Sequence, residues 1–483
     1  MYLGLDLGTS GIKALIIDEK QNVIASSNSP LNVSRLHSGW SEQDPQEWID
    51  ATRAAMEALK RSHPTELAAV RGLGFSGQMH GATLLDADDD VLRPCMLWND
   101  TRSHVEAARL DANPIFRKLS GNIVFPGFTA PKVEWVRINE PDTFAKTTKI
   151  LLPKDYLRLW LTGEHVSEMS DAAGTSWLDV GKRCWSDELL DACQLDQSHM
   201  PDLVEGTDIS GQLRPELAQE WGMGSVKVAG GAGDNAASAI GLGAVAAGSA
   251  FVSLGTSGVL FASNASYLPN PDSAVHAFCH AVPGTWHQMG VFLSATDSLN
   301  WWAGVCDRSA VDLTGELEGE LHPPSGISFL PYLSGERTPH NDASIRGAFV
   351  GLDHAHDRKT MTQSVLEGVA FALRDSLEAL SSAGTKLERV MAVGGGTRSD
   401  YWLQLVSSVL QMPVDLPRDG DFGAAFGAAR LGLIAAEGAD PLAICTQPQI
   451  AKTYEPNGQL IAAYENAYGT YRSLYPALSG AMG

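Results

Sequence analysis

The chain has 483 residues and a formal net charge of −22 at pH 7, because 57 Asp and Glu outnumber 35 Lys and Arg. Apolar residues make up 44% and charged residues 19%, which is typical of a folded globular protein and excludes an intrinsically disordered chain. This length predicts two or three domains. The acidic excess disfavours nucleic acid as a partner, so an anionic substrate would need local hydrogen-bond donors or a metal ion.

The cysteines and the apolar segments predict a cytoplasmic protein without a membrane span. The six cysteines are scattered and form no Cys-x-x-Cys pair, as expected for reduced thiols. The first residues reach Asp6 without a basic stretch, so no secretory signal is visible. The most apolar segment, 239–262, is interrupted by glycines that favour strands and turns over a bilayer helix.

The first elements along the chain indicate an α/β fold. Two apolar runs, 2–5 and 12–17, flank the turn LGTSG, a pattern typical of a β-hairpin. The segment DPQE at 44–47 places an N-cap Asp before a Pro and a Glu, so a helix is expected to follow. Residues 70–75 then predict a strand that leads into a glycine-bearing loop. This alternation of strands and helices is typical of α/β architecture.

An internal repeat divides the chain into two halves. The turn LGTSG at 7–11 recurs at 254–258, again between two apolar runs. The elements expected after the second copy are a helix over 361–380, a strand over 389–393, the glycine loop 394–396 and a helix over 401–410. Both halves therefore have the order hairpin, helix, strand, glycine-bearing loop. We predict two domains, residues 1–246 and 247–483.

The repeated turn suits a polyphosphate ligand. Turns of Gly, Thr and Ser present backbone N–H groups and hydroxyls at close range, which phosphate oxygens require. Two such turns, one from each half, could grip one polyphosphate from both sides. Lys13, two residues beyond the first turn, could add a positive charge. Ordinary hairpin turns without a ligand are the alternative interpretation.

Two carboxylates stand beside glycine-rich turns. Asp6 precedes the first turn at the end of a strand, and Asp234 lies in the run GGAGDN at 230–235. A lone carboxylate in an apolar, glycine-rich neighbourhood is a candidate general base. The alternative is an Asp that caps a helix. The glycines of 72–77 match the dinucleotide fingerprint, but no helix is predicted after them, which disfavours a Rossmann site.

These motifs, taken together and in order, resemble the FGGY family of carbohydrate kinases. The resemblance covers nearly the whole chain. It is carried by the segments GLDLGTS at 4–10, GQMHG at 77–81, LWNDTR at 97–102, GDN at 233–235, SLGTSG at 253–258, PYLSGERTPH at 331–340 and GGG at 394–396.

The resemblance implies an α/β protein of two actin-like (ribonuclease H-like) domains with an interdomain cleft. It also implies ATP and Mg²⁺, and phosphorylation of D-xylulose to D-xylulose 5-phosphate. The first domain would bind the sugar and the second ATP. Implied site residues are Asp234 (catalytic base and metal ligand), Asp6 (catalytic and metal ligand), Met79, His80, Trp98, Asn99, Asp100, Arg102 and Asn235 (sugar), and Gly8, Thr9, Ser10, Lys13, Gly255, Thr256, Gly395 and Gly396 (nucleotide).

Two alternatives stay open from the sequence. One is a kinase of the same family for another ketose or a polyol, such as ribulose or a glycerol-like substrate. The other is a non-catalytic actin-like nucleotide switch, which has no need of a base together with sugar-binding side chains. The expected partners are a small sugar and ATP, without nucleic acid or membrane. The sequence does not determine the oligomeric state, and a homodimer is one of the states that it allows.

Overall fold

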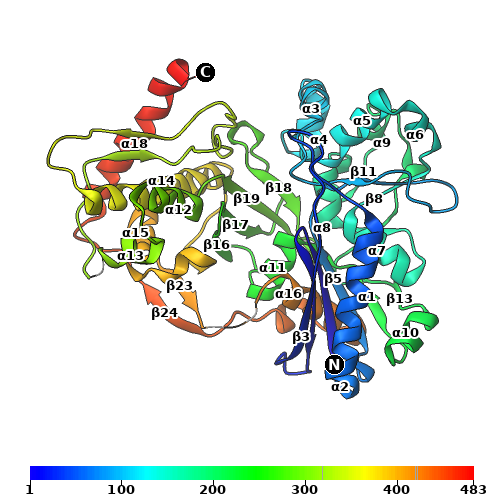
Figure 1. Ribbon diagram of the computed structural model, residues 1–483. Coiled ribbons are helices and arrows are strands. Elements are labelled where there is room, and N and C mark those ends of the chain that lie inside the picture. Colours follow the sequence, from blue (N-terminus) through cyan, green and yellow to red (C-terminus); the bar gives the residue numbers. More distant parts are fainter. Residues whose placement is uncertain (318, 419, 421, 483) are drawn as a thin grey trace.

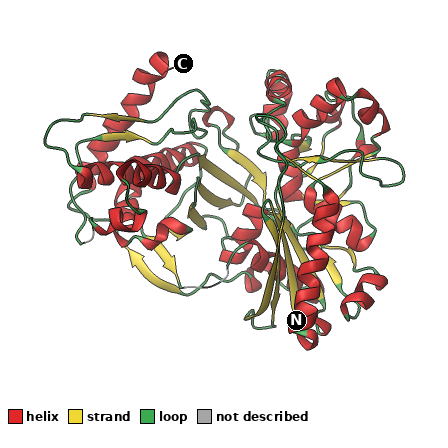
Figure 2. Ribbon diagram, viewed as in Figure 1, coloured by secondary structure: helices red, strands yellow, loops and turns green. Residues whose placement is uncertain are grey.

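A computed structural model describes residues 1–317, 319–418, 420 and 422–482 of the chain. The chain forms two lobes, and each lobe contains one seven-stranded sheet (Figure 1). Helices pack around both sheets (Figure 2). Each sheet lies in a separate cluster of buried apolar side chains. Among the described residues, no helix has the length and apolar character needed to cross a membrane.

The first sheet has the strand order β13-β14-β5-β1-β2-β3, with β15 beside β5. Its strands are β1 (Tyr2–Gly8), β2 (Gly11–Ile17), β3 (Val23–Pro30), β5 (Gly72–Gly77), β13 (Ile209–Gln212), β14 (Lys227–Ala229) and β15 (Ala232–Gly233). The second sheet has the order β18-β19-β17-β16-β22-β23-β24. Its strands are β16 (Ala250–Leu254), β17 (Gly258–Asn264), β18 (His276–Cys279), β19 (Trp286–Phe292), β22 (Val390–Val393), β23 (Val414–Pro417) and β24 (Ile450–Tyr454).

The two sheets share one topology, which confirms that the sequence repeat is structural. In the first sheet, β1 pairs antiparallel with β2 and parallel with β5. In the second, β16 pairs antiparallel with β17 and parallel with β22. On the far side of the first sheet, β14 pairs parallel with β5 and antiparallel with β13. In the same way, β23 of the second sheet pairs parallel with β22 and antiparallel with β24. Both copies of LGTSG form the predicted hairpin turns.

The helices observed agree closely with those expected from the sequence. The helices used below are α1 (Pro45–Ser62), α7 (Pro153–Thr162), α8 (Met169–Ala172), α11 (Asp234–Leu242), α12 (Thr296–Cys306), α13 (Ala310–Gly315), α14 (Arg358–Ser382), α15 (Asp400–Leu410) and α16 (Ala424–Glu437). The Asp44 side chain accepts from the Gln46 amide and caps α1, as the DPQE pattern predicts. The helices predicted over 361–380 and 401–410 correspond to α14 and α15.

Helix α16 belongs to the second half of the sequence but packs on the first sheet. It lies against β1 and β5 in the middle of the molecule, where α11 also packs on it (Figure 1, orange helix). The approach requires glycine: a Cβ on Gly4 would lie 1.9 Å from the Ala425 carbonyl oxygen, and one on Gly74 would lie 2.0 Å from that of Ala428. The domain division at residue 246 stays a prediction.

Candidate active site

Three parallel strands of the first sheet end at one edge, and the candidate catalytic residues lie near these ends, Asp6 within β1 and Asp234 directly after β15. β5 lies between β1 and β15, and Ser76 on β5 pairs with Asp6 on one side and Ala232 on the other. Because the carboxyl ends of parallel strands meet at one edge, Asp6 and Asp234 come together there. The loop after β5 begins at the same edge. Ligands of open α/β sheets bind at this kind of edge.

Asp234 is the first residue of α11. Its Oδ1 accepts hydrogen bonds from the Asn235 amide at 2.7 Å and from Asn235 Nδ2 at 3.0 Å. Burial raises the pKa of Asp234 to about 6, the Asn235 hydrogen bonds oppose the shift, and the nearby charge of Asp6 adds to it. A carboxylate with a pKa near 6 is ionised at neutral pH yet holds a proton better than an exposed one. Asp234 is therefore suited to accept a proton.

Asp6 and Lys13 lie opposite each other in the β1–β2 ladder, so both side chains project from the same face of the sheet. Asp6 and Asp234 are the only two carboxylates that the sequence analysis assigned to a metal. Within the described residues, no group of three or more His, Cys, Asp and Glu could hold a metal ion. Two carboxylates fit Mg²⁺, because this ion commonly binds one or two carboxylates together with substrate phosphates.

Five charged side chains form a buried cluster behind the loop that carries Asp234: Lys154, Asp155, Arg158, Glu168 and Asp171. All five are fully buried. Lys154 Nζ lies 2.7 Å from Asp155, 3.1 Å from Asp171 and 3.4 Å from Glu168. Burial lowers the pKa of Lys154, but these three carboxylates outweigh that effect and raise it. Lys154 is therefore the cation that all three acids share, and Arg158 adds a second positive charge 3.3 Å from Asp155.

The Lys154 cluster, comprising those five residues, is hydrogen bonded to the loop before Asp234. Arg158 donates to the Gly230 carbonyl oxygen. Ser170 Oγ accepts from the Gly233 amide at 3.1 Å and donates to Glu168 at 2.8 Å. These contacts fix both ends of the glycine-rich segment 230–233, and so fix the start of α11 from behind.

His80 and Met79 occupy the loop after β5. His80 Nδ1 lies 2.8 Å from the Gly174 carbonyl oxygen, and its ring stacks on Phe128 with centroids 4.5 Å apart. Burial, together with the nearby Lys132, lowers the pKa of His80 to about 3, so the ring is neutral at physiological pH. Its Nδ1 donates to Gly174, which leaves Nε2 as an acceptor for a hydroxyl. A Cβ on Gly233 would lie 2.9 Å from Met79 Sδ, so Met79 packs directly beside Asp234.

Trp98 and Thr9 connect the sugar-side residues with the first hairpin turn. The Trp98 indole is 47% exposed, and its Nε1 donates to Thr9 Oγ1 at 3.0 Å. The Thr9 hydroxyl in turn donates to Gln78 Oε1 at 2.9 Å, and Gln43 Nε2 donates to the Thr9 carbonyl oxygen at 2.7 Å. The Thr9 hydroxyl therefore orients Trp98.

Asp100 and Arg102 make their contacts inside the protein. Arg102 forms a two-pronged ion pair with Asp100 and contacts Glu42 at 2.9 Å. Its guanidinium lies 3.5 Å from the centroid of the Trp40 ring. These contacts hold the loop that carries Trp98, and the predicted contact of Asp100 and Arg102 with the sugar stays a prediction. Asn99 Oδ1 is buried and makes no hydrogen bond with the described residues.

The second hairpin turn has different neighbours. The Gly255 carbonyl oxygen accepts from the Thr296 amide at 2.9 Å, and that of Thr256 accepts from the Ala295 amide at 2.8 Å, so the turn is tied to the start of α12. The glycine loop after β22 passes beside it: a Cβ on Gly394 would lie 2.7 Å from the Leu254 carbonyl oxygen. The turn and the glycine loop therefore form one backbone-lined surface.

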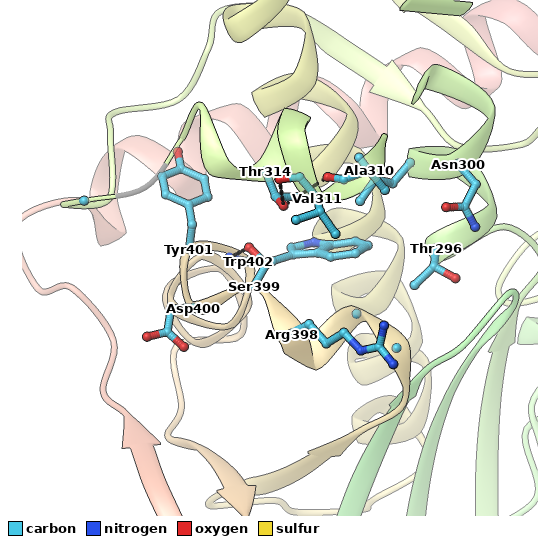
Figure 3. A pocket seen from close by; sticks show the side chains of 14 residues that line it. Thr296, Asn300, Ala310, Val311, Thr314, Arg398, Ser399, Asp400, Tyr401 and Trp402 are labelled. Atoms are coloured by element: carbon cyan, nitrogen blue, oxygen red, sulfur yellow. Dashed lines mark hydrogen bonds between the residues drawn. The ribbon is translucent and has the colours of Figure 1, made fainter. Parts of the chain in front are cut away.

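A cavity of about 790 Å³ opens beside the glycine loop (Figure 3). It lies between α12, α13 and α15, and Arg398 projects into it from the loop side in the close-up. The volume suits a nucleoside. The lining residues are Thr296, Leu299, Asn300, Ala310, Val311, Thr314, Gly319, Gly395, Gly396, Arg398, Ser399, Asp400, Tyr401 and Trp402. Of these, the sequence analysis found Gly395 and Gly396 alone, because the residues on α12 and α13 belong to no motif.

A smaller cavity of about 340 Å³ lies between the two halves. Its lining includes Asn235 and Ser238 on α11 and Ser253 and Gly394 at the ends of β16 and β22. The cavity thus joins the start of α11, next to Asp234, to the backbone-lined surface of the second half. This arrangement agrees with the expected interdomain cleft.

Comparison with known proteins yields matches over both halves. The model of the N-terminal domain of the FGGY family of carbohydrate kinases matches residues 1–241, and that of its C-terminal domain matches residues 250–436. A xylulose kinase from Escherichia coli strain K12 is 48% identical over 483 residues, which is 99% of each chain.

Two solved structures extend this comparison to three dimensions. The crystal structure of a xyloylose kinase from Brucella ovis is 63% identical, has a TM-score of 0.98 and covers 99% of each chain. The crystal structure of a gluconate kinase from Lactobacillus acidophilus is 26% identical, has a TM-score of 0.93 and covers 100% of this chain and 98% of its own. Overall shape is therefore shared between proteins named for different substrates.

Proposed function

The chain belongs to the FGGY family of carbohydrate kinases, and we propose that it transfers the γ-phosphoryl group of ATP to the 5-hydroxyl of D-xylulose, with Asp234 as general base. The two halves are the actin-like, ribonuclease H-like domains of that family. The observation that carries the proposal is the position of Asp234. It lies beside Met79 and the sugar-side loop, and at the same time next to the cavity that leads to the second half.

The choice of sugar rests on the relatives and on the composition of the sugar side. Both the 48% and the 63% identical proteins carry names of kinases for the same ketose. Met79 and Trp98 offer apolar surface to a carbon chain, and His80 Nε2 and Asn235 offer hydrogen bonds to hydroxyls. Residues 1–246 would bind the sugar, and residues 247–483 would bind ATP in the cavity of about 790 Å³.

Phosphoryl transfer needs alignment, a base and compensation of charge more than covalent participation by the protein. Asp234 would accept the proton of the attacking hydroxyl, and the Lys154 cluster holds its loop in place. The backbone amides of the turns 8–10 and 255–257 would hold the phosphates, with Lys13 adding a positive charge. Asp6 and Asp234 would bind Mg²⁺, which supplies positive charge to the phosphates when bound.

The six cysteines are all free thiols, which supports a cytoplasmic location for the enzyme. Closure of the two halves around both substrates would exclude water and limit the hydrolysis of ATP. The test is a coupled assay of ATP consumption with D-xylulose, D-ribulose, L-ribulose, xylitol, glycerol and gluconate as acceptors. We expect D-xylulose to give the highest kcat/KM. A clearly higher value with another acceptor would contradict the choice of sugar and leave the family assignment intact.

A further inference from the structure

Arg337 is a cation near the sugar-side residues that the proposed mechanism does not use. It lies in the loop after β20 (Ser328–Leu330), within the segment GERTP of the second half. Its guanidinium lies 4.8 Å from the centroid of the Phe125 ring, which belongs to the first half. Its Nη1 lies 3.4 Å from His276 Nε2. Arg337 thus extends from one half to the other.

The surroundings of Arg337 connect it to His80. Phe128 stacks on His80, and its ring centroid lies 5.5 Å from that of Phe125 and 5.7 Å from that of His276. The positive charge of Arg337 contributes to the lowered pKa of His80, after burial and Lys132. Arg337 therefore lies on the aromatic group that packs against His80.

The backbone on both sides of Arg337 is fixed. Glu336 Oε1 accepts from the Arg337 amide at 2.7 Å and from the Leu293 amide at 3.1 Å. The Thr338 amide donates to the Val291 carbonyl oxygen at 2.9 Å, and Thr338 Oγ1 accepts from the Val291 amide at 3.0 Å. The backbone that carries Arg337 is therefore held in place before any ligand arrives, which lowers the entropic cost of a contact with a ligand.

Within the described part of the chain, no carboxylate forms an ion pair with Arg337. Arg183 provides a contrast, because it also lies over an aromatic ring, Trp286, at 5.4 Å, but it pairs with Glu205 at 2.5 Å. A guanidinium has five N–H donors. The described contacts of Arg337 use one of them, on His276, and its side chain is partly exposed. Arg337 therefore has donors available for an oxygen-rich ligand.

We propose that Arg337 donates a hydrogen bond to the C2 carbonyl oxygen of the ketose and so makes the site prefer ketoses to polyols. The proposal rests on the proposed function and deepens it. With the 5-hydroxyl at Asp234, this contact would place the C2 carbonyl at the end of the sugar that faces the aromatic group beside His80. A second-half residue that contacts the sugar would also couple sugar binding to the position of the ATP-binding half.

The preference follows from hydrogen-bond chemistry. A guanidinium can only donate, and a ketone oxygen can only accept, so the two are matched. A polyol has a hydroxyl at C2 instead, and its proton needs an acceptor. Phe125 and Phe128 offer none, and His276 Nε2 already faces Arg337. A buried hydroxyl proton without a partner weakens binding, so the polyol is discriminated against.

The test compares D-xylulose with xylitol, its C2-reduced counterpart, in the wild type, Arg337→Met and Arg337→Lys. For Arg337→Met we expect kcat/KM for D-xylulose to fall about 10- to 100-fold, the range for one hydrogen bond from a charged donor. The kcat/KM for xylitol, or its inhibition constant against D-xylulose where turnover is too slow, should change less than about threefold. Arg337→Lys should lie between the wild type and Arg337→Met, because it keeps the charge but loses the planar fork.

Arg183→Met is the matched control, and it should change the values for D-xylulose and xylitol in parallel. A parallel fall for both sugars in Arg337→Met would overturn the proposal and leave a structural role. If Arg337→Met does not fold, as judged by thermal melting, Arg337→Lys decides by the same ratio. If the wild type does not phosphorylate D-xylulose, the proposed function fails. If it does phosphorylate D-xylulose, but the ratio of kcat/KM for D-xylulose to that for xylitol is the same in the variants as in the wild type, only the proposed role of Arg337 is contradicted.

Discussion

The two hairpin turns of the molecule have the same five-residue sequence and the same position in their sheets, but they make different contacts. The first turn is joined through Thr9 to Gln78, Gln43 and Trp98. The second is joined through Gly255 and Thr256 to α12 and lies against the glycine loop after β22. The repeat thus places the same turn in two different surroundings, and we expect the neighbours of each turn to decide what binds there.

The two halves also differ in how their charged residues are arranged. The first half contains the fully buried Lys154 cluster behind Asp234, whereas Lys452 and Asp400 on the second half form an ion pair that is largely exposed. The first half also receives α16 from the second half of the sequence. The loop that carries Asp234 is therefore held by buried charged residues, whereas the Lys452–Asp400 pair is open to solvent.

The largest effect is expected from the Lys154 cluster. Lys154→Met leaves three buried carboxylates without their shared cation, so the free energy of unfolding should fall by about 3–5 kcal/mol. Lys452→Met removes one partner of an exposed ion pair and should change the free energy of unfolding by less than about 1 kcal/mol. Urea unfolding of both variants measures the difference. Equal effects would mean that the cluster does not stabilise the first half more than a surface pair does.

A similar contrast applies to two glycines. Gly4→Ala would force a Cβ to within 1.9 Å of a backbone oxygen of α16, so we expect a loss of about 3 kcal/mol in the free energy of unfolding. Gly304 lies inside α12, where, apart from the adjacent residues and the backbone of the helix itself, no atom of the described residues lies within 4 Å of an added Cβ. Gly304→Ala should stabilise the protein by about 0.5–1 kcal/mol through helix propensity. Thermal and urea unfolding of both variants measure this difference. A Gly304→Ala variant less stable than the wild type would contradict the prediction.

The smallest effect distinguishes the two turns. Thr9→Val removes the hydroxyl that orients Trp98, so kcat/KM for the sugar should fall about 3- to 10-fold, equivalent to one hydrogen bond. The KM for ATP should stay within about twofold. Thr256→Val should have the opposite pattern, because that turn is bonded to the start of α12, which lines the proposed nucleotide cavity. Steady-state kinetics with each substrate varied in turn tests this prediction. If both variants change the KM of the same substrate, the two turns do not serve different substrates.

The sequence was sufficient to predict the parts of the fold that repeat or that depend on local signals. The two copies of LGTSG predicted both hairpins, and the Asp44 cap predicted the start of α1. Strand pairing then brings Asp6 and Asp234 together, because each lies near the carboxyl end of a strand of the first sheet. The packing of α16 on the first sheet could not be predicted, because the close approach to Gly4 and Gly74 depends on tertiary contacts.

The parts of the site that could not be predicted from the sequence have no local sequence pattern. The Lys154 cluster brings together residues of α7, β9 (Val166–Glu168) and α8, whose spacing follows no known motif. The residues of α12 and α13 that line the large cavity are likewise unremarkable in sequence. Asp100 and Arg102 belong to a motif of the family resemblance and form an ion pair with each other, and their predicted contact with the sugar stays a prediction.

The central claim is that Asp234 is the general base of a sugar kinase whose nucleotide is bound mainly by the other half. The most direct measurement combines the rate of ATP-dependent D-xylulose phosphorylation by Asp234→Asn with its affinity for ATP. We expect kcat to fall by about 10²–10⁴-fold, while the dissociation constant for ATP without added metal stays within a few-fold and the thermal stability is retained. A kcat near that of the wild type would contradict the role of Asp234.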